Sequence, residues 1–166
     1  MFVLKRNGRK ESVKFDKVTA RIQKLSYGLS PLVDVIDVAK KVIEGIYDGV
    51  TTTELDNLAA ETAASLTIRH PDYALLASRI AISNLHKNTA KSFTETMRSL
   101  YHYTDKANGR SMPLIADDVM QIIGDNAELL DSSIIYDPDF GFDYFGFKTL
   151  EKSYLLPIDG RVAGRP

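Results

Sequence analysis

Residues 2–17 of the chain read FVLKRNGRKESVKFDK, and this stretch decides how the fold begins. Two extended-looking runs, Phe2 to Arg6 and Lys10 to Phe15, flank the pair Asn7-Gly8. Because Asn-Gly readily takes the positive φ angles of a tight turn, the stretch predicts a β-hairpin. Asp16 follows directly and is expected to cap the first helix.

Outward from the hairpin, apolar residues recur at helical spacing. The first helix is expected to end at Tyr27-Gly28, and the second to run from about Asp34 to a stop at Gly49. Thr51 and Glu54 have the spacing of a capping box and predict the start of a third helix. Its expected inner face consists of Leu55, Leu58, Ala59, Thr62 and Leu66.

A fourth helix is predicted to open at Pro71-Asp72, with an inner stripe of Tyr73, Leu76 and Ile80. Its helical pattern continues through Leu85 toward Leu100. From Tyr101 onward, Gly and Pro interrupt short apolar pieces, so this part is expected to be less self-contained. The run 154–158 resembles a strand entering a larger fold, and we expect the chain to be truncated.

Composition limits the possible functions. The 166 residues are 44% hydrophobic and 26% charged, as in an ordinary globular protein. A net charge of -1 gives no overall attraction to nucleic acid, although Lys and Arg crowd the start and residues 115–147 carry acidic side chains without Lys or Arg. No apolar run spans a bilayer and no secretory signal is visible, so a soluble, cytoplasmic protein is expected.

Cysteine is absent from the sequence, which excludes disulfides, thiolate metal sites and thiol-radical chemistry. The histidines, His70, His86 and His102, lack metal-ligand spacing with acidic partners, so we expect no structural metal. No Gly-rich phosphate loop, nucleophile elbow or paired-carboxylate arrangement stands out. An independent enzyme is therefore not expected.

The hairpin is the most informative candidate site, because basic residues flank its turn and suit a triphosphate electrostatically. They are Lys5, Arg6, Arg9 and Lys10. The alternative is a solvated turn that happens to carry basic residues. Glu11 lies inside this basic cluster. It either neutralises the cluster or accepts a hydrogen bond from an amino group such as that of adenine.

Further candidates lie on the third and fourth helices. The start of the third helix offers free amides and the hydroxyl groups of Thr51 to Thr53, which either bind an anion or only cap the helix. Asp56 is interpreted as a first-turn carboxylate, favourable in any helix, with a sugar hydroxyl as the functional alternative. Lys87 follows Ile80 by two helical turns and either reaches solvent or meets a buried partner.

Taken together, the hairpin and helices resemble the ATP-cone, the regulatory nucleotide-binding domain of many ribonucleotide reductase large subunits. Later residues look like the start of the eukaryotic-type class I large subunit. The cone motifs are Val3 to Arg9, Phe15 to Val18, Arg21 to Leu25, Gly49 to Thr52, Glu54 to Asp56, Leu58 to Ala64, His70 to Tyr73 and Ser83 to Lys87, and the later ones are Ile134 to Asp137 and Tyr144 to Leu156.

The resemblance implies a mainly α fold, a short helical bundle capped by a small β-sheet or hairpin. Residues 1–91 would form the cone, and residues 92–166 the incomplete, mostly helical beginning of the next domain. In the family pattern Lys5, Arg6, Thr52 and Lys87 would hold phosphate, Asp56 would lie near the ribose, and the base pocket would be lined by Glu11, Ser12, Val13, Lys14, Phe15, Asp16 and Lys17.

In the intact family, ATP at this site permits ribonucleoside-diphosphate reduction, and dATP stops it by changing how large subunits associate. The resemblance therefore implies ATP or dATP as effector, with Mg²⁺ on the phosphates. It also implies self-association of large subunits and a small radical-generating subunit as a partner, in the service of DNA synthesis. The chain alone is expected to be non-catalytic, since it lacks the required cysteines and barrel.

Two other classes remain open. A basic-hairpin nucleic-acid-binding module would bind mixed-sequence DNA with an affinity that falls steeply with salt. A purely structural interaction domain would bind neither ligand. A nucleotide-sensing repressor with an ATP-cone is set aside, because its zinc ribbon needs cysteines.

Overall fold

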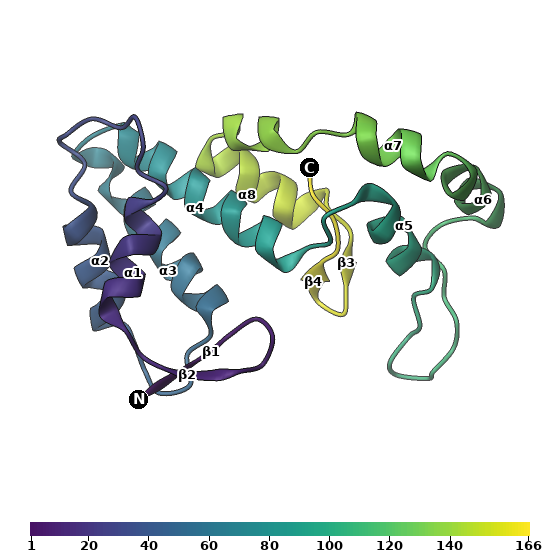
Figure 1. The fold of residues 1–166 in the computed structure, drawn as a ribbon, viewed down its shortest axis with the longest axis horizontal. Coiled ribbons are helices and arrows are strands. Elements are labelled where there is room, and N and C mark those ends of the chain that lie inside the picture. Colours follow the sequence, from purple (N-terminus) through teal and green to yellow (C-terminus); the bar gives the residue numbers. More distant parts are fainter. The chain divides into compact units, whose positions relative to one another are not determined.

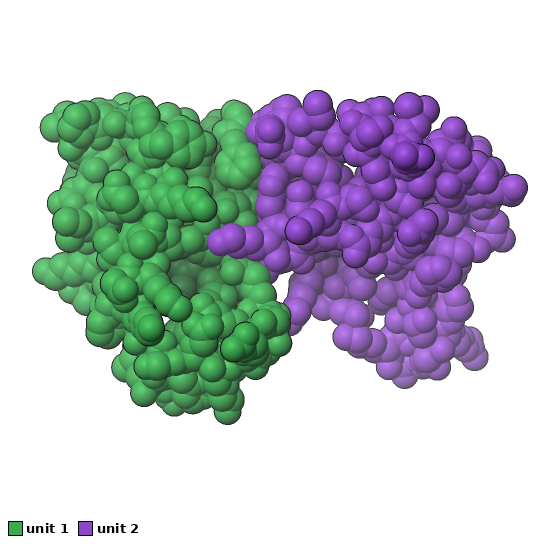
Figure 2. All heavy atoms as spheres, viewed as in Figure 1, with its two compact units in different colours: residues 1–84, 140–147 green, residues 85–139, 148–166 purple.

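The computed structural model describes residues 1–166, which divide into two compact units. One unit holds residues 1–84 and 140–147, and the other holds residues 85–139 and 148–166 (Figure 2). The elements are β1 (Phe2–Leu4), β2 (Lys10–Ser12), α1 (Phe15–Gln23), α2 (Val35–Glu44), α3 (Thr52–Ser65), the 3-10 helix η1 (Leu66–Ile68), α4 (Asp72–Asn88), α5 (Phe93–Tyr101), α6 (Asp117–Asp125), α7 (Ala127–Ser133), the 3-10 helix η2 (Asp137–Gly141), α8 (Tyr144–Ser153), β3 (Pro157–Ile158) and β4 (Arg161–Val162).

The predicted hairpin is present, with shorter strands than the sequence suggested. β1 and β2 pair antiparallel, and Val3 faces Glu11 across the ladder. The backbone N–H of Lys5 donates to Arg9 O at 2.8 Å, and Gly8 takes a φ of +79°. Asn7 does not take a positive φ; its side-chain oxygen instead accepts from the Arg9 N–H at 3.2 Å. One glycine is therefore enough for this turn.

The segment before α3 extends the small sheet. The Leu4 N–H donates to Val50 O at 2.9 Å, and the Gly49 N–H donates to Phe2 O at 2.9 Å. These bonds anchor β1 next to the N-terminal end of α3 (Figure 1). The "cap" on the helical bundle thus consists of the hairpin plus a short parallel bridge between Leu4 and Thr51.

The predicted starts of α2 near Asp34, of α3 after Thr51 and of α4 at Pro71-Asp72 are confirmed. Asp34 caps α2 and Thr51 forms the predicted capping box with Glu54. The prediction for Asp16 is wrong, because α1 begins at Phe15 and Asp16 lies inside its first turn. A carboxylate there still favours the positive end of the helix dipole.

Helix ends were predicted less well. α2 ends at Glu44 with Gly45 as C-cap, earlier than the predicted stop at Gly49. Gly49 has a φ of +86° and serves the turn that leads back to β1. Gly49 therefore has the positive φ angle expected of a helix-ending glycine, but it lies in the turn after α2 and does not end that helix.

The core of the first unit is formed by the bundle of α1, α2, α3 and the first part of α4 (Figure 1). Tyr73, Leu76 and Ile80 are buried as predicted. The predicted inner face of the third helix is confirmed in part. Ala59 and Leu66 are buried, whereas Leu55, Leu58 and Thr62 are half-buried. The fully buried positions are Asp56, Ala59, Ala60 and Ala63.

The small alanines of α3 have a consequence for Asp56. Because side chains three and four residues apart share one side of a helix, Asp56 lies on the same face as Ala59, Ala60 and Ala63. That face is directed into the bundle. The rotation of α3 thus carries a carboxylate inward.

The expected continuous helix from Asp72 toward Leu100 is wrong, because α4 ends at Asn88 and α5 starts at Phe93. Ser92 adopts an extended conformation and its hydroxyl accepts from the Glu95 N–H at 3.2 Å. This cap satisfies an amide that a new helix leaves unpaired.

No helix of the structure combines the length and the apolar character that crossing a membrane requires.

The second unit consists mainly of short helices, with side-chain hydrogen bonds, an ion pair and a cation–π contact between its segments. The Thr94 N–H donates to Asp131 at 2.8 Å, and the Arg165 guanidinium lies 4.8 Å from the Tyr136 ring centre. The expected strand at residues 154–158 is reduced to Pro157–Ile158, which pairs with β4. Lys106 pairs with Asp159 at 2.9 Å.

Candidate functional site

The central feature of the first unit is a buried carboxylate held by two arginines. Asp56 is 6% exposed. Arg6 Nη2 donates to its Oδ2 at 2.8 Å, while Arg21 donates from Nε to Oδ1 and from Nη2 to Oδ2, both at 3.2 Å. A buried carboxylate requires such partners, because desolvation of an unpaired charge is costly.

These contacts correct the sequence interpretation of Asp56. α3 begins at Thr52, so Asp56 is its fifth residue and Glu54 is the acidic residue of the first turn. The account of Asp56 as an ordinary first-turn carboxylate is therefore wrong. The ion pairs with Arg6 and Arg21 compensate the charge that the packing of α3 buries.

Arg6 is oriented by further contacts from two helices. Its Nη2 also donates to Asn84 Oδ1 at 2.5 Å, and its Nη1 donates to Thr52 Oγ1 at 3.3 Å. Asn84 is itself buried and donates to Asn57 Oδ1 at 2.9 Å. The hairpin arginine is thus placed at the N-terminal end of α3 against the side of α4.

Arg21 joins the same cluster from α1. Its Nη2 donates to Ser83 Oγ on α4 at 2.9 Å. Two guanidinium groups and one carboxylate leave the cluster with a formal charge of +1, which favours an anion. We call Arg6, Arg21, Asp56 and Asn84 the arginine cluster.

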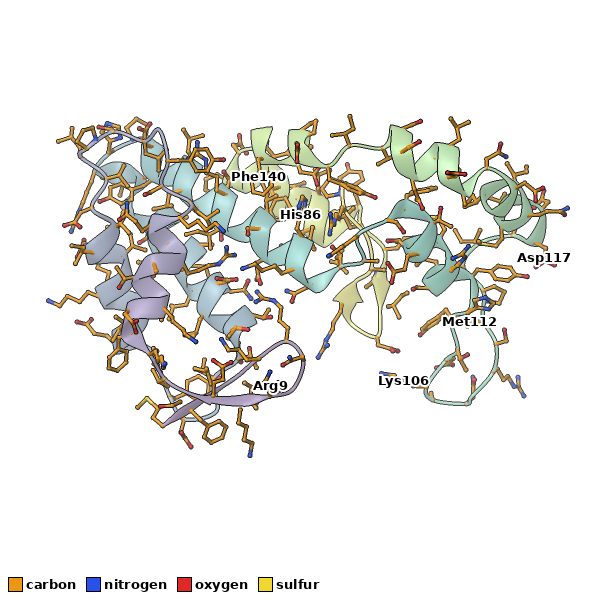
Figure 3. The ribbon with its side chains drawn as sticks, in the orientation of Figure 1. Arg9, His86, Lys106, Met112, Asp117 and Phe140 are labelled. Carbon is orange, nitrogen blue, oxygen red and sulfur yellow. The ribbon has the colours of Figure 1, made fainter.

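A second cluster joins the hairpin to the first turn of α1. Glu11 Oε2 contacts Lys17 Nζ at 3.2 Å and Lys5 Nζ at 3.3 Å. The hydrogen bond from Lys17, and then that from Lys5, lowers the pKa of the Glu11 carboxyl below its usual value. Figure 3 shows Arg9 in the turn that connects β1 and β2.

The structure therefore brings the predicted site residues together in two groups: Arg6 with Thr52 and Asp56, and Glu11 with Lys5 and Lys17. Of the remaining residues of the predicted base pocket, Ser12, Lys14, Phe15 and Asp16 are exposed and Val13 is half-buried. Lys87 is exposed, lies on α4 three residues after Asn84 and is counted with the second unit.

Sequence reasoning assigned no role to Arg21, Ser83 or Asn84. Arg21 and Asp56 are separated by 35 residues, and Arg6 and Asn84 by 78, so no local pattern links them. Asn84 is, with Ser78, a polar residue on the mostly apolar buried side of α4, and it was the one available signal for the cluster. No group of three or more His, Asp or Glu side chains is arranged to hold a metal ion.

Comparison with known proteins gives the class. Residues 1–88 match the family model described as "ATP cone domain", and the chain belongs to this family. The match covers β1 through α4, so it includes every residue of both clusters.

Over its whole length the chain is similar to the large subunit of ribonucleoside-diphosphate reductase. It is 61% identical to the subunit of Arabidopsis thaliana, across 100% of this chain and 20% of that protein. It is 58% identical to the Danio rerio subunit, across 100% of the chain and 21% of the relative, and 55% identical to large chain 2 of Saccharomyces cerevisiae, across 100% and 19%. The chain thus spans about a fifth of the length of these relatives.

Proposed function

We propose that this chain binds ATP and dATP as allosteric effectors, with Mg²⁺ accompanying the phosphates. The observation that carries the proposal is the arginine cluster, which has a surplus positive charge and lies within the residues that match the ATP cone domain. Arg6 and Lys5 would bind phosphate oxygens, because guanidinium and ammonium groups form charge-assisted hydrogen bonds with them.

The N-terminal end of α3 supplies the rest of the proposed phosphate site. Thr52 already accepts a bond from Arg6, and its hydroxyl can also donate to a phosphate oxygen. Helix amides add a positive partial charge at this end. Lys87 would add a cation from α4, and Asp56 would accept a hydrogen bond from the ribose.

The base is proposed to lie against the hairpin and the start of α1, along Glu11 to Lys17. Both lysine contacts of Glu11 are made through Oε2. A carboxylate carries lone pairs on both oxygens, so Oε1 is the atom proposed to accept from the adenine amino group.

In a longer protein of the kind that the relatives represent, this site would control ribonucleoside-diphosphate reduction. ATP would permit activity, and dATP would stop it through large-subunit self-association, from dimers to higher oligomers. A small radical-generating subunit would be the other partner, the setting cytoplasmic and the product deoxyribonucleotides for DNA replication. The chain itself is proposed to be non-catalytic, with residues 1–91 as the nucleotide-binding domain and residues 92–166 as the start of the next.

The test is a titration with MgATP and with mixed-sequence DNA, on the wild-type chain and on Arg6→Gln. A charge-assisted contact contributes about 1.5 to 3 kcal/mol, so ATP affinity should fall about 10- to 150-fold. Arg69→Gln is the matched control, because Arg69 pairs at the same 2.8 Å with Asp37 at an exposed site.

An ATP affinity within about twofold of wild type is expected for this control. Equal affinities of all three proteins for ATP would contradict the proposal. DNA binding that falls steeply with salt, in the absence of ATP binding, would instead support the nucleic-acid-binding alternative.

A further inference from the structure

Arg21 has the geometry of a clamp on Asp56. It uses two nitrogens, Nε and Nη2, on the two different carboxylate oxygens, which fixes the carboxylate plane as well as its position. Arg21 on α1 thereby contacts α3, and it also contacts α4, because its Nη2 donates to Ser83 Oγ. Arg21 lies in the last turn of α1, where the helix dipole favours a cation.

Arg6 is held differently. Its contact with the carboxylate joins one nitrogen, Nη2, to one oxygen, Oδ2, and its other bonds go to Asn84 Oδ1 and Thr52 Oγ1, which are uncharged acceptors. The residue lies at the exposed turn of the hairpin. A one-point contact with Asp56 constrains the ion pair less than the two-point contact of Arg21 does. Of the two arginines, Arg6 is therefore the one that can exchange partners.

An exchange of partners by Arg6 has a consequence for Asp56, whose side chain is 8% exposed. If Arg6 were its sole cation, departure to a phosphate would leave a buried carboxylate without compensation, which is strongly unfavourable. With Arg21 in place, the carboxylate keeps a two-point partner. Arg6 then carries the surplus charge of the cluster.

We propose that Arg21 is a positioning residue of the nucleotide site, which holds Asp56 so that Arg6 moves from Asp56 to a phosphate of the incoming triphosphate. Arg21 itself does not contact the nucleotide. In the unliganded chain Arg6 pairs with the Asp56 carboxylate in place of a phosphate. Because Arg21 stays paired with Asp56, Arg6 can leave the carboxylate without leaving its charge uncompensated. This inference rests on the proposed function.

The test is calorimetric titration of the whole 166-residue chain with MgATP and with adenosine. Arg21→Gln should weaken ATP binding at least 10-fold and change adenosine binding less than about twofold, because only a phosphate recruits Arg6. Arg21→Lys keeps the charge and should recover part of the loss. Lys24→Gln, at an exposed position of the same segment, is the matched control for removal of a positive charge.

A double-mutant cycle separates positioning from a direct effect. In the Asp56→Asn background no carboxylate needs compensation, so Arg21→Gln should change ATP affinity less than about threefold. The same 10-fold loss in both backgrounds would show that Arg21 acts on the phosphates directly and would overturn the proposal. If Arg21→Gln fails to fold, the pair Arg21→Lys and Arg21→Lys/Asp56→Asn gives the same comparison.

Failure of this inference is distinguishable from failure of the proposed function. A wild-type chain that binds neither ATP nor dATP contradicts the function. A wild-type chain that binds ATP, together with an Arg21→Gln chain whose affinity is within twofold of it, contradicts only the role of Arg21.

Discussion

Replacement of Asp56 by Asn tests whether the buried ion pairs stabilise the fold as the geometry indicates. An amide at this position keeps one oxygen and replaces the other with an N–H₂ donor. In the native contacts Oδ2 accepts from both Arg6 and Arg21, at 2.8 and 3.2 Å, and Oδ1 accepts from Arg21 Nε at 3.2 Å, so the amide nitrogen would face one or two donors according to its orientation.

The magnitude follows from those contacts. Each charge-assisted bond contributes about 1.5 to 3 kcal/mol, so two lost bonds set an upper limit of about 6 kcal/mol. The real loss is smaller, because the side chains of Arg6 and Arg21 are 25% and 21% exposed and can be hydrated. They also keep Asn84 and Ser83 as acceptors. We expect a decrease of about 2 to 3 kcal/mol in the free energy of unfolding.

The assay is urea denaturation followed by circular dichroism, with Asp37→Asn as control. Asp37 accepts from Arg69 at the same 2.8 Å, but the Arg69 side chain is 61% exposed, so its loss should cost no more than about 1 kcal/mol. Equal losses in the two variants would refute the inference that burial makes the Asp56 contacts stronger.

The same variant has a binding prediction. ATP and dATP differ in the ribose 2′-hydroxyl, and an amide can donate where a carboxylate only accepts. We therefore expect Asp56→Asn to change the ratio of the two dissociation constants more than it changes either one. An unchanged ratio would mean that the sugar is recognised elsewhere.

Three further predictions concern single side chains. Lys87→Ala should weaken triphosphate binding about 10-fold or more in calorimetry, with little change in adenosine binding or thermal stability. A variant that unfolds, while its remaining folded protein keeps the wild-type affinity, would make Lys87 structural. Thr51→Ala removes the N-cap of α3 and should lower the free energy of unfolding by about 1 kcal/mol, whereas no measurable change would show that Glu54 caps the helix alone. Lys17→Met removes the largest cause of the lowered Glu11 pKa, so this pKa should rise toward 4.5 in an NMR titration. A lowered carboxyl pKa stabilises the fold above about pH 4.5, and this contribution is lost as the pH falls through the folded-state pKa. The variant should therefore show a smaller loss of stability over that pH range.

The sequence predicted the parts of the fold that depend on neighbouring residues. Thr51 and Glu54, and Asp34 alone, identified helix starts because a cap is a contact across two or three positions. Ser92 and Glu95 carry the same spacing and could have revealed the start of α5, but the apolar pattern that continues past Asn88 concealed it.

The candidate site was predictable only in part, for a physical reason. Arg6 and Glu11 were recognised from the charge of the hairpin, which is local. The burial of Asp56 depends on which face of α3 packs inward, and its second partner, Arg21, comes from another helix. Contacts between distant elements leave no spacing in the sequence from which to infer them.

Calorimetric titration of the 166-residue chain with ATP, dATP and GTP in the presence of Mg²⁺ tests most directly whether the arginine cluster and the hairpin form an adenine-nucleotide site. We expect saturable binding of ATP and dATP and at least 10-fold weaker binding of GTP, which lacks the adenine amino group that Glu11 is proposed to recognise. Equal binding of all three nucleotides would contradict recognition of the base, and no binding of ATP or dATP would contradict the site itself.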